Sequence, residues 1–223
     1  MALTTDYIYQ YTLNLIKKNQ AGALGSVEWG RHWNGESNAY QDDLLGRFQR
    51  ISNGKSGINT GLIESETILQ KLAPFTKNAT IAIALGNGSK PSDFKYLLAL
   101  RIDGRDAHHF NKNQKATVMD NVIDPPSITD GEYYYTEYQG QYSFLPTTVT
   151  SAEIDYVASP VDVVWGFTIS GGRQVYNAGT STQPQWDDAS CREITKRVLS
   201  TLGISFKDGD FANFGQHIIN TGN

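Results

Sequence analysis

The stretch WDDASCREITKRVLSTLGISF, residues 186–206, is the clearest single helix in the sequence, and it decides the fold class. Asp187 or Asp188 can cap its amino end, because a carboxylate there accepts hydrogen bonds from N–H groups that lack partners inside the helix. Gly203 supplies the left-handed residue that commonly ends a helix. Apolar side chains recur every three or four residues, on one helical face: Cys191, Ile194, Val198 and Leu202. We expect a scaffold helix over residues 187–202.

The sequence just before this helix favours β structure, and that sets the expected position of the helix. Short runs rich in aromatic and β-branched residues predict four strands: 133–138, 142–145, 152–157 and 163–169. Residues 173–177, which follow a Gly-Gly pair, are predicted to complete a hairpin with the last of these strands. We therefore expect helix 187–202 to pack on the open face of the sheet.

The first third of the chain has a helical pattern instead. Three helices are predicted: residues 4–21, capped by Thr4 or Thr5, a long helix from Ser26 to about residue 52, and about 62–72. In the first of them an apolar stripe is expected to face the core: Ile8, Tyr11, Leu15 and Ile16. The short connections between these helices favour antiparallel neighbours.

The pattern changes from helix to strand near Asn78. The runs ATIAIAL (79–85) and KYLLALRI (95–102) predict two strands, and residues 116–119 a short third. The chain is thus expected to have an α+β fold: a helical N-terminal third, a mixed, mainly antiparallel β region, and a C-terminal helix packed on the sheet. The expected division is a helical region at 1–75, a β-rich region with its covering helix at 76–206, and a tail or arm at 207–223.

The composition of the 223 residues bounds the class of protein. Charged residues make up 19% and hydrophobic residues 39%, both below the usual shares. This profile is closer to virion components and carbohydrate-binding modules than to metabolic enzymes. The net charge of −4 argues against a nucleic-acid partner, because phosphate binding depends on clustered Lys and Arg.

Cysteine content and hydrophobic runs bear on where the protein is made. The single Cys191 cannot form an intramolecular disulfide, and its place on the apolar helix face predicts a buried, inert thiol. The first residues show no secretory signal pattern, and no apolar run approaches the ~20 residues of a membrane span. We expect a soluble protein, made in a cytoplasm, that does not contact a membrane.

Candidate catalytic and ligand-binding motifs all have simpler explanations. Residues 86–90 (GNGSK) have the wrong spacing for a phosphate loop and are predicted to form a turn. His108 and His109 are adjacent, so on a strand they would face opposite ways and could not share a metal. We accordingly expect no enzymatic activity, no metal and no cofactor.

A cluster of tyrosines is the most informative local feature: Tyr133, Tyr134, Tyr135, Tyr138 and Tyr142. Alternation along strands would place some of these rings on an exposed sheet face, where Tyr can stack on sugars or bind proteins. Core packing and cross-strand pairing explain the same pattern.

The order of several segments resembles a known family of proteins. The segments are YTLNLIKKNQAG (11–22), WNGESNAYQDDLLGRFQ (33–49), PSDFKY (91–96), EIDY (153–156) and the helix at 186–203. Their progression resembles ring or adaptor proteins of the head-to-tail connector in crAss-like and related podovirus-like tailed bacteriophages of Bacteroidota. The likeness spans nearly the whole chain and rests on packing motifs. The lysine-rich signature of a channel wall is missing from this sequence.

The resemblance implies a mechanical role in the neck and tail region of the virion. Copies would form a homo-oligomeric ring, twelvefold like the portal above it, that extends and seals the DNA exit conduit between head and tail. DNA would pass through without specific binding, and the family has no catalytic residues to transfer. The interface candidates are Trp29, Trp33, Tyr40, Tyr134, Phe211, Phe214 and Ile218.

Two alternatives remain open at the level of sequence. The chain could be another virion component, such as a tail, capsid-decoration or fibre-adaptor protein, or a carbohydrate-binding β module built on the tyrosine-rich sheet. The tail at 207–223 also has two explanations. It folds back on its own domain, or it is an arm that lies on a neighbouring subunit.

Overall fold

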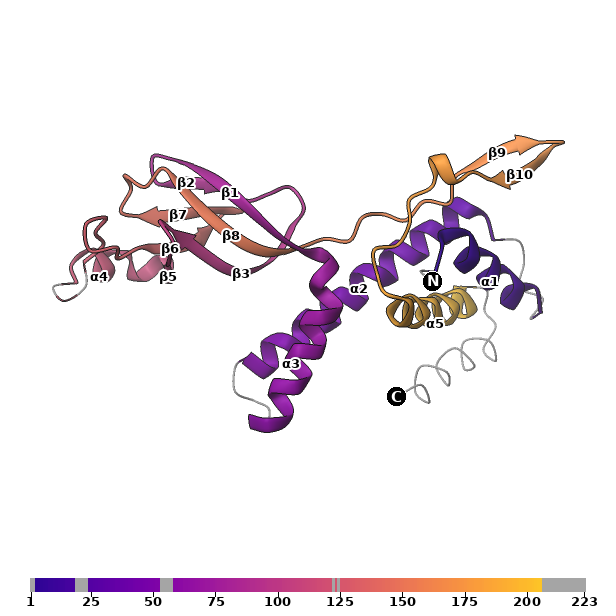
Figure 1. Cartoon of the computed structure of the whole chain (residues 1–223), viewed down its shortest axis with the longest axis horizontal. Helices are drawn as coiled ribbons and strands as arrows, with labels where there is room; N and C mark the ends of the chain where they lie inside the picture. The colour runs from indigo at the N-terminus through magenta and orange to yellow at the C-terminus, as the bar shows by residue number, and fades with distance from the viewer. Residues whose placement is uncertain (1–2, 19–23, 53–57, 122, 124, 206–223) are drawn as a thin grey trace. The chain divides into compact units, whose positions relative to one another are not determined.

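The computed structural model contains two compact units (Figure 1). The first, called the helical unit, comprises Met1–Pro74 and Pro160–Asn223, and the second, the β unit, comprises Phe75–Ser159. This division differs from the predicted boundary, because the chain returns to the helical unit well before residue 206. The structure describes residues 3–18, 24–52, 58–121, 123 and 125–205.

The helical unit is built from both ends of the chain. Its described helices are α1 Thr5–Lys18, α2 Ser26–Ser52, α3 Ile58–Leu72, η3 Ala178–Thr180 and α5 Asp188–Ser205, with η1 Ala73–Phe75 at its boundary. The predicted caps are confirmed: the Tyr7 N–H donates to Thr4 Oγ1 at 3.2 Å, and the Ser190 N–H donates to Asp187 Oδ1 at 2.8 Å. The predicted end of the last helix at Gly203 is wrong, since α5 continues to Ser205.

The expectation that helix 187–202 packs on the sheet is wrong. Helix α5 packs against α2 and α1 inside the helical unit. The Trp186 indole N–H donates to Ser37 Oγ at 2.7 Å, and the Thr201 hydroxyl donates to Glu36 Oε1 at 2.7 Å. The apolar stripe of α5 showed correctly that one face is buried. It carried no information about which element buries that face.

A small separate sheet also belongs to the helical unit. Of the predicted strand at 163–169 only the end is a strand: β9 (Phe167–Ser170) pairs antiparallel with β10 (Arg173–Tyr176). The predicted hairpin is therefore confirmed. The chain before β9 is fixed to α2 instead, because Asn34 Oδ1 accepts from the Val163 N–H at 2.8 Å.

The β unit is one twisted sheet, in the order β4-β3-β8-β1-β2-β7-β6-β5. Its strands are β1 Thr76–Ala84, β2 Asn87–Ser89, β3 Phe94–Ile102, β4 Arg105–Asp106, β5 His108–His109, β6 Tyr134–Tyr138, β7 Gln141–Leu145 and β8 Ser151–Ala158. All neighbouring pairs are antiparallel except β5 and β6. The predicted α+β class with a mainly antiparallel sheet is confirmed. The short strand predicted at 116–119 is wrong, since α4 (Lys115–Met119) follows η2 (Lys112–Gln114) there.

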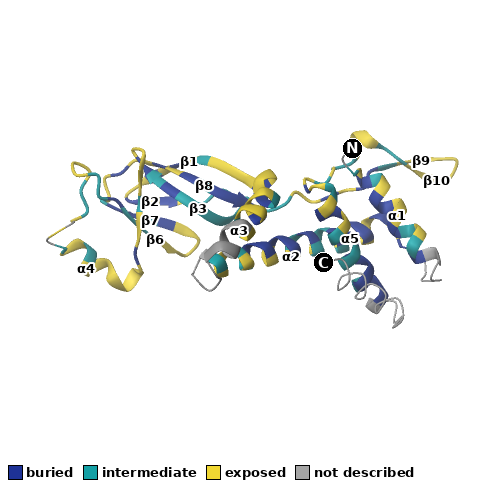
Figure 2. Cartoon of the chain, turned by 60° about the horizontal axis from the view of Figure 1, so that its bottom comes forward, coloured by how far each residue is buried: buried dark blue, intermediate teal, exposed yellow. Residues whose placement is uncertain are grey.

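The β unit has its own core, formed by alternate residues of the strands. Ile81, Leu100, Phe144 and Ile154 are all buried, and Figure 2 shows the buried positions alternating with exposed ones along the strands. Thr76 at the start of β1 pairs with Val157 at the end of β8. The two ends of the β unit therefore lie side by side, which is the geometry of an inserted domain.

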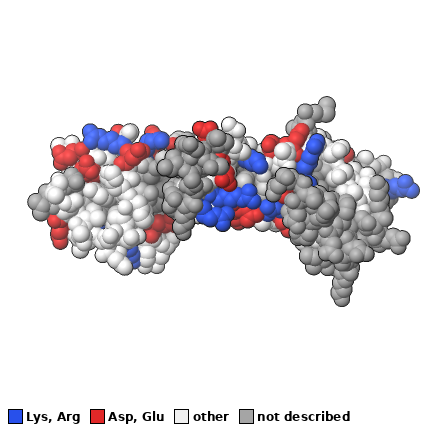
Figure 3. Space-filling model, turned by 90° about the horizontal axis from the view of Figure 1, so that it is seen from below, with Lys and Arg blue, Asp and Glu red and all other residues white. Residues whose placement is uncertain are grey.

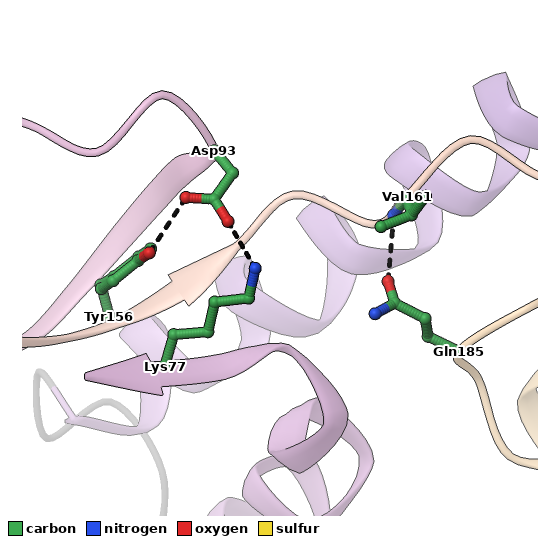
Figure 4. A network of polar contacts seen from close by, with 5 residues as sticks. All are labelled: Lys77, Asp93, Tyr156, Val161 and Gln185. Atoms are coloured by element: carbon green, nitrogen blue, oxygen red, sulfur yellow. Dashed lines mark hydrogen bonds and ion pairs between the residues drawn. The ribbon is translucent and has the colours of Figure 1, made fainter. Parts of the chain in front are cut away.

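A polar cluster fixes one end of the sheet (Figure 4). The Asp93 carboxylate accepts from Lys77 Nζ at 2.6 Å and from the Tyr156 hydroxyl at 3.0 Å. The hydrogen bond from Lys77 lowers the pKa of Asp93 below its ordinary value. A second carboxylate, Asp155, accepts from Asn78 Nδ2 at 2.8 Å and from an Arg101 guanidinium N–H at 2.7 Å, which lowers its pKa too.

Candidate interaction surfaces

Three of the predicted interface residues are core residues of the helical unit. Trp29 and Trp33 have no exposed surface, and Tyr40 exposes only 6% of its area. They are unavailable to another molecule in this conformation, so their assignment to an interface is wrong. The aromatic stripe of α2 fits a core and an interface equally well, and only the position of α5 decides between them.

Close ring contacts show how these residues pack. The Trp29 and Trp33 ring centroids are 5.7 Å apart, and Tyr9 lies 5.3 Å from Trp29. Tyr40 packs edge-on against Trp186 at 5.2 Å, and Lys71 Nζ donates to its hydroxyl at 3.3 Å. These aromatic side chains therefore join α1, α2 and α5 in one core.

The other predicted interface residues have different outcomes. Tyr134 is half-buried on β6, and its ring centroid lies 5.6 Å from that of His108. Its role at an interface stays a prediction. Phe211, Phe214 and Ile218 lie outside the described residues, so their role stays a prediction as well.

The tyrosine cluster does not form an open row of rings. Tyr133 and Tyr142 are buried, and Tyr134 and Tyr135 are half-buried beside the two histidines. Tyr138 is 45% exposed, but Lys112 Nζ lies 3.3 Å from its ring centroid and covers one face. A sugar-stacking platform needs free ring faces, and this arrangement leaves few of them.

The β9–β10 hairpin is an exposed part of the helical unit, and in Figure 1 it projects beyond the helices of that unit. Gly171 and Gly172 at its tip have φ values of 56° and 74°, which a two-residue turn between twisted strands requires. Ile169 and Val175 are 74% and 49% exposed, and Figure 2 shows the hairpin in the colours of exposed and intermediate residues. In the described part of the chain, this sheet has only the two strands.

The base of the hairpin, by contrast, is fixed firmly. The Trp165 ring stacks on Phe167 at 5.9 Å and lies 4.8 Å from Tyr9 of α1. Its indole N–H donates to Asp6 Oδ1 at 2.9 Å. A Cβ at Gly166 would collide with Thr180, so only glycine fits at this close approach. The hairpin is therefore a rigidly mounted arm whose outer half has no cover.

A groove between α1 and α5 is the second surface with uncovered apolar groups. Its volume is about 280 Å³, and its lining residues are Leu3, Tyr7, Ile8, Tyr11, Leu15, Arg192, Thr195, Lys196 and Leu199. Tyr7 and Tyr11 are 57% and 47% exposed and stack in parallel, with centroids 6.2 Å apart. Tyr11 was predicted to face the core with Ile8, but the stripe is narrower than expected and leaves it at the groove.

Reactive and ligating groups offer little chemistry in the described residues. Cys191 is buried, and burial raises the pKa of its thiol to about 12, so the neutral thiol predominates at physiological pH. Among those residues no three His, Cys, Asp or Glu side chains are placed to hold a metal ion. Nor does any described helix combine the length and apolar character needed to cross a bilayer. The expectation of no enzymatic activity stays a prediction.

Comparison with known proteins gave no assignment. A scan against models of protein families found no match, and a search of curated proteins found none either. The resemblance to phage connector proteins therefore stays a prediction.

Sequence reasoning missed both exposed surfaces. The signal for the hairpin was available, because Ile169 and Val175 flank the Gly-Gly turn on strands too short to be a sheet of their own. The groove had no comparable signal, since it depends on α1 and α5, which are distant in the sequence, lying together.

Proposed function

We propose that the protein is a structural component of a tailed-bacteriophage virion, which assembles into a ring between portal and tail and extends and seals the DNA exit conduit. The observation that carries the proposal is the rigidly mounted β9–β10 hairpin with its uncovered apolar side chains. A two-stranded hairpin is only marginally stable by itself in water. Ile169 pairs with Gln174 and Val175 with Thr168, so the two apolar side chains lie on opposite faces of the ribbon. Contact with another chain would bury one face, with Ile169 the more exposed of the two, and pair a free strand edge.

A ring needs contacts of a particular kind. Each copy must present one surface to the copy on one side and a different surface to the copy on the other side. A projecting hairpin fits this requirement if it inserts into a different surface of the neighbouring copy. Permanent rings bury on the order of 2,000 Å² or more per contact, so further surface must join the hairpin.

The distribution of charge supports a conduit that does not grip DNA. The net charge is −4, and on the face drawn in Figure 3 basic atoms lie beside acidic ones, with broad uncharged areas between them. Tight DNA binding needs clustered Lys and Arg that neutralise phosphates. DNA would thus slide past such a surface without a specific contact.

The test is the solution mass of the protein alone and mixed with the portal protein of the same phage, by sedimentation or mass photometry. We expect a closed ring, alone or on the portal, and we expect Ile169→Lys to weaken it at least ten-fold. Met119→Lys is the matched control, because Met119 is 56% exposed but belongs to the β unit. A monomer under all conditions, or equal effects of the two variants, would refute the hairpin as the ring contact.

The alternatives give different results in the same set of experiments. Another virion component would join particles without forming a ring on the portal. A carbohydrate-binding module would bind glycans and lose that affinity in Tyr138→Ala, the most exposed ring of the cluster. If the proposed function is right, neither the unmodified protein nor the Tyr138→Ala variant binds glycans.

A further inference from the structure

The α1–α5 groove is a built apolar site with a charged rim. Ile8 and Leu199 at its floor are each 2% exposed, while Tyr7 and Tyr11 form an uncovered wall. Arg192 lies on the opposite rim and is exposed. A groove that combines two exposed rings with a cation is suited to a short amphipathic segment with acidic residues.

We propose that this groove is the docking site of residues 211–219 of the same chain. The segment has apolar residues at three- and four-residue intervals, the spacing of one helical face: Phe211, Phe214, Ile218 and Ile219. Acidic residues precede it at Asp208 and Asp210, at the end of the segment that would approach Lys196, a cation in the lining of the groove. Asp210 is also placed to cap a helix that begins at Phe211.

The chain can reach the groove from where α5 ends. Leu199 lines one end of the groove and Arg192 the other, and α5 continues past Leu199 to Ser205. Residues 206–210 can span up to ~17 Å, which exceeds the ~9 Å rise of α5 from Leu199 to its end. Lys207, Asp208 and Gly209 are residues that favour a reversal of direction.

The lengths of groove and segment also agree. A helix over residues 211–219 is about 14 Å long, and α5 rises about 10 Å between Arg192 and Leu199. An antiparallel helix in the groove would place residue 211 near Leu199 and residue 220 near Arg192. This polarity follows from the reversal of the chain after α5.

The short linker decides which copy supplies the segment. A flexible linker of a few residues gives an effective concentration in the millimolar range, far above that of separate chains at micromolar concentration. The segment therefore docks on its own chain, and Tyr7 and Tyr11 are covered in the free protein. This inference does not depend on the proposed ring function.

Disulfide trapping in the full chain tests the proposal. Arg192→Cys with Asn220→Cys places two thiols at the same end of the groove, and Arg173→Cys with Asn220→Cys is the control on the exposed hairpin. Buried Cys191 stays in place. We expect a disulfide within one chain that forms at least ten-fold faster in the groove pair than in the control pair, at a rate independent of protein concentration.

A second variant separates docking from folding. Phe211→Ser with Phe214→Ser, added to the groove pair, should reduce trapping to the control rate while tryptophan fluorescence stays native. Equal trapping rates in the groove and control pairs would overturn the proposal. Disulfide-linked dimers that increase with protein concentration would also overturn it, because they would show that the segment docks on a second copy.

Discussion

The helical unit and the β unit bury different aromatic residues, for reasons of connectivity. All four tryptophans belong to the helical unit: Trp29, Trp33, Trp165 and Trp186. That unit joins segments more than a hundred residues apart, and large indole rings bridge helices from both chain ends. The β unit is one continuous segment, and its smaller core of Ile, Tyr and Phe is filled by alternating strand residues. The tryptophans therefore report on one unit alone.

The two units also differ in where they expose apolar side chains. The helical unit carries an apolar hairpin and an apolar groove with no cover in the described residues. In the β unit the most exposed large apolar side chains lie in a turn and a loop, Leu85 at 92% and Ile123 at 86%, while polar pairs such as Arg101 with Asp155 lie on the strands. The hairpin is thus the part of the helical unit where we expect contact with another chain first.

The largest expected effect comes from emptying the helical core. Trp33→Ala should lower the free energy of unfolding of the helical unit by about 3–5 kcal/mol, because it removes a fully buried ring. Urea titration followed by tryptophan fluorescence measures this change, and hydrogen exchange of the β1 and β8 amides follows the β unit. The β unit should keep its midpoint. A matching shift in both signals would show that the two units unfold as one.

The single thiol gives a second test confined to the helical unit. Burial raises the pKa of Cys191 from 9.0 to about 12, so the thiolate fraction at pH 8 is about a thousand-fold lower than in the unfolded chain. A thiol reagent should label the native protein slower than urea-unfolded protein by at least this factor. Fast labelling of native protein would mean that the α2–α5 contact opens readily.

Within the β unit, two tyrosines should respond in opposite ways. The Tyr142 hydroxyl is buried without a hydrogen-bond partner among the described residues, so Tyr142→Phe should leave the unit equally stable or more stable by up to ~1 kcal/mol. Tyr133→Phe is the comparison, because its hydroxyl donates to Asp103 Oδ2 at 2.8 Å. It should cost about 0.5–1.5 kcal/mol. Hydrogen exchange of the β1 and β8 amides in both variants measures the difference.

The smallest expected effect is the acid response of the β unit. Hydrogen bonds from Lys77 and Asn78 lower the pKa values of Asp93 and Asp155 below 3.8 in the folded state. The unfolded chain then takes up these protons first, so stability is lost as pH falls from about 4 through the lowered values. Urea midpoints at pH 7 and pH 3 should show this loss.

Asp93→Asn should abolish part of the acid response, since an amide cannot be protonated in this range. Asp120→Asn, at the exposed residue that follows α4, is the control and should keep the full response. If both variants respond to acid alike, the Lys77–Asp93 pair does not contribute. The loss is expected to be small because both side chains are partly exposed.

Local structure could be predicted from the sequence where periodicity and caps agree. The helices at both chain ends, the caps at Thr4 and Asp187 and the strands around Ile81 and Ile154 all depend on neighbours a few residues away. The short run at 116–119 could not be assigned, because a few mildly apolar residues fit one helical turn as well as a strand.

The position of the last helix could not be predicted in this way. The apolar face of α5 would have suited a sheet or another helix, and the choice depends on α2, where Ser37 and Tyr40 contact Trp186 and Ser190 across 149 and 150 residues of sequence. The same limit applied to the candidate sites. An aromatic stripe records that rings are buried somewhere, and it does not distinguish a neighbour in the same chain from a neighbour in another copy.

The insertion of the β unit between the two parts of the helical unit affects the order of events on the ribosome. The β unit is complete once Ser159 has emerged, while α1, α2 and α3 still lack α5. At 5–20 residues per second, translation from Pro74 to Leu202 takes on the order of ten seconds. During that time Tyr40 of α2 lacks Trp186 and Ser190, against which it packs in the folded protein. We therefore expect the later segment of the sequence to fold before the earlier one is complete.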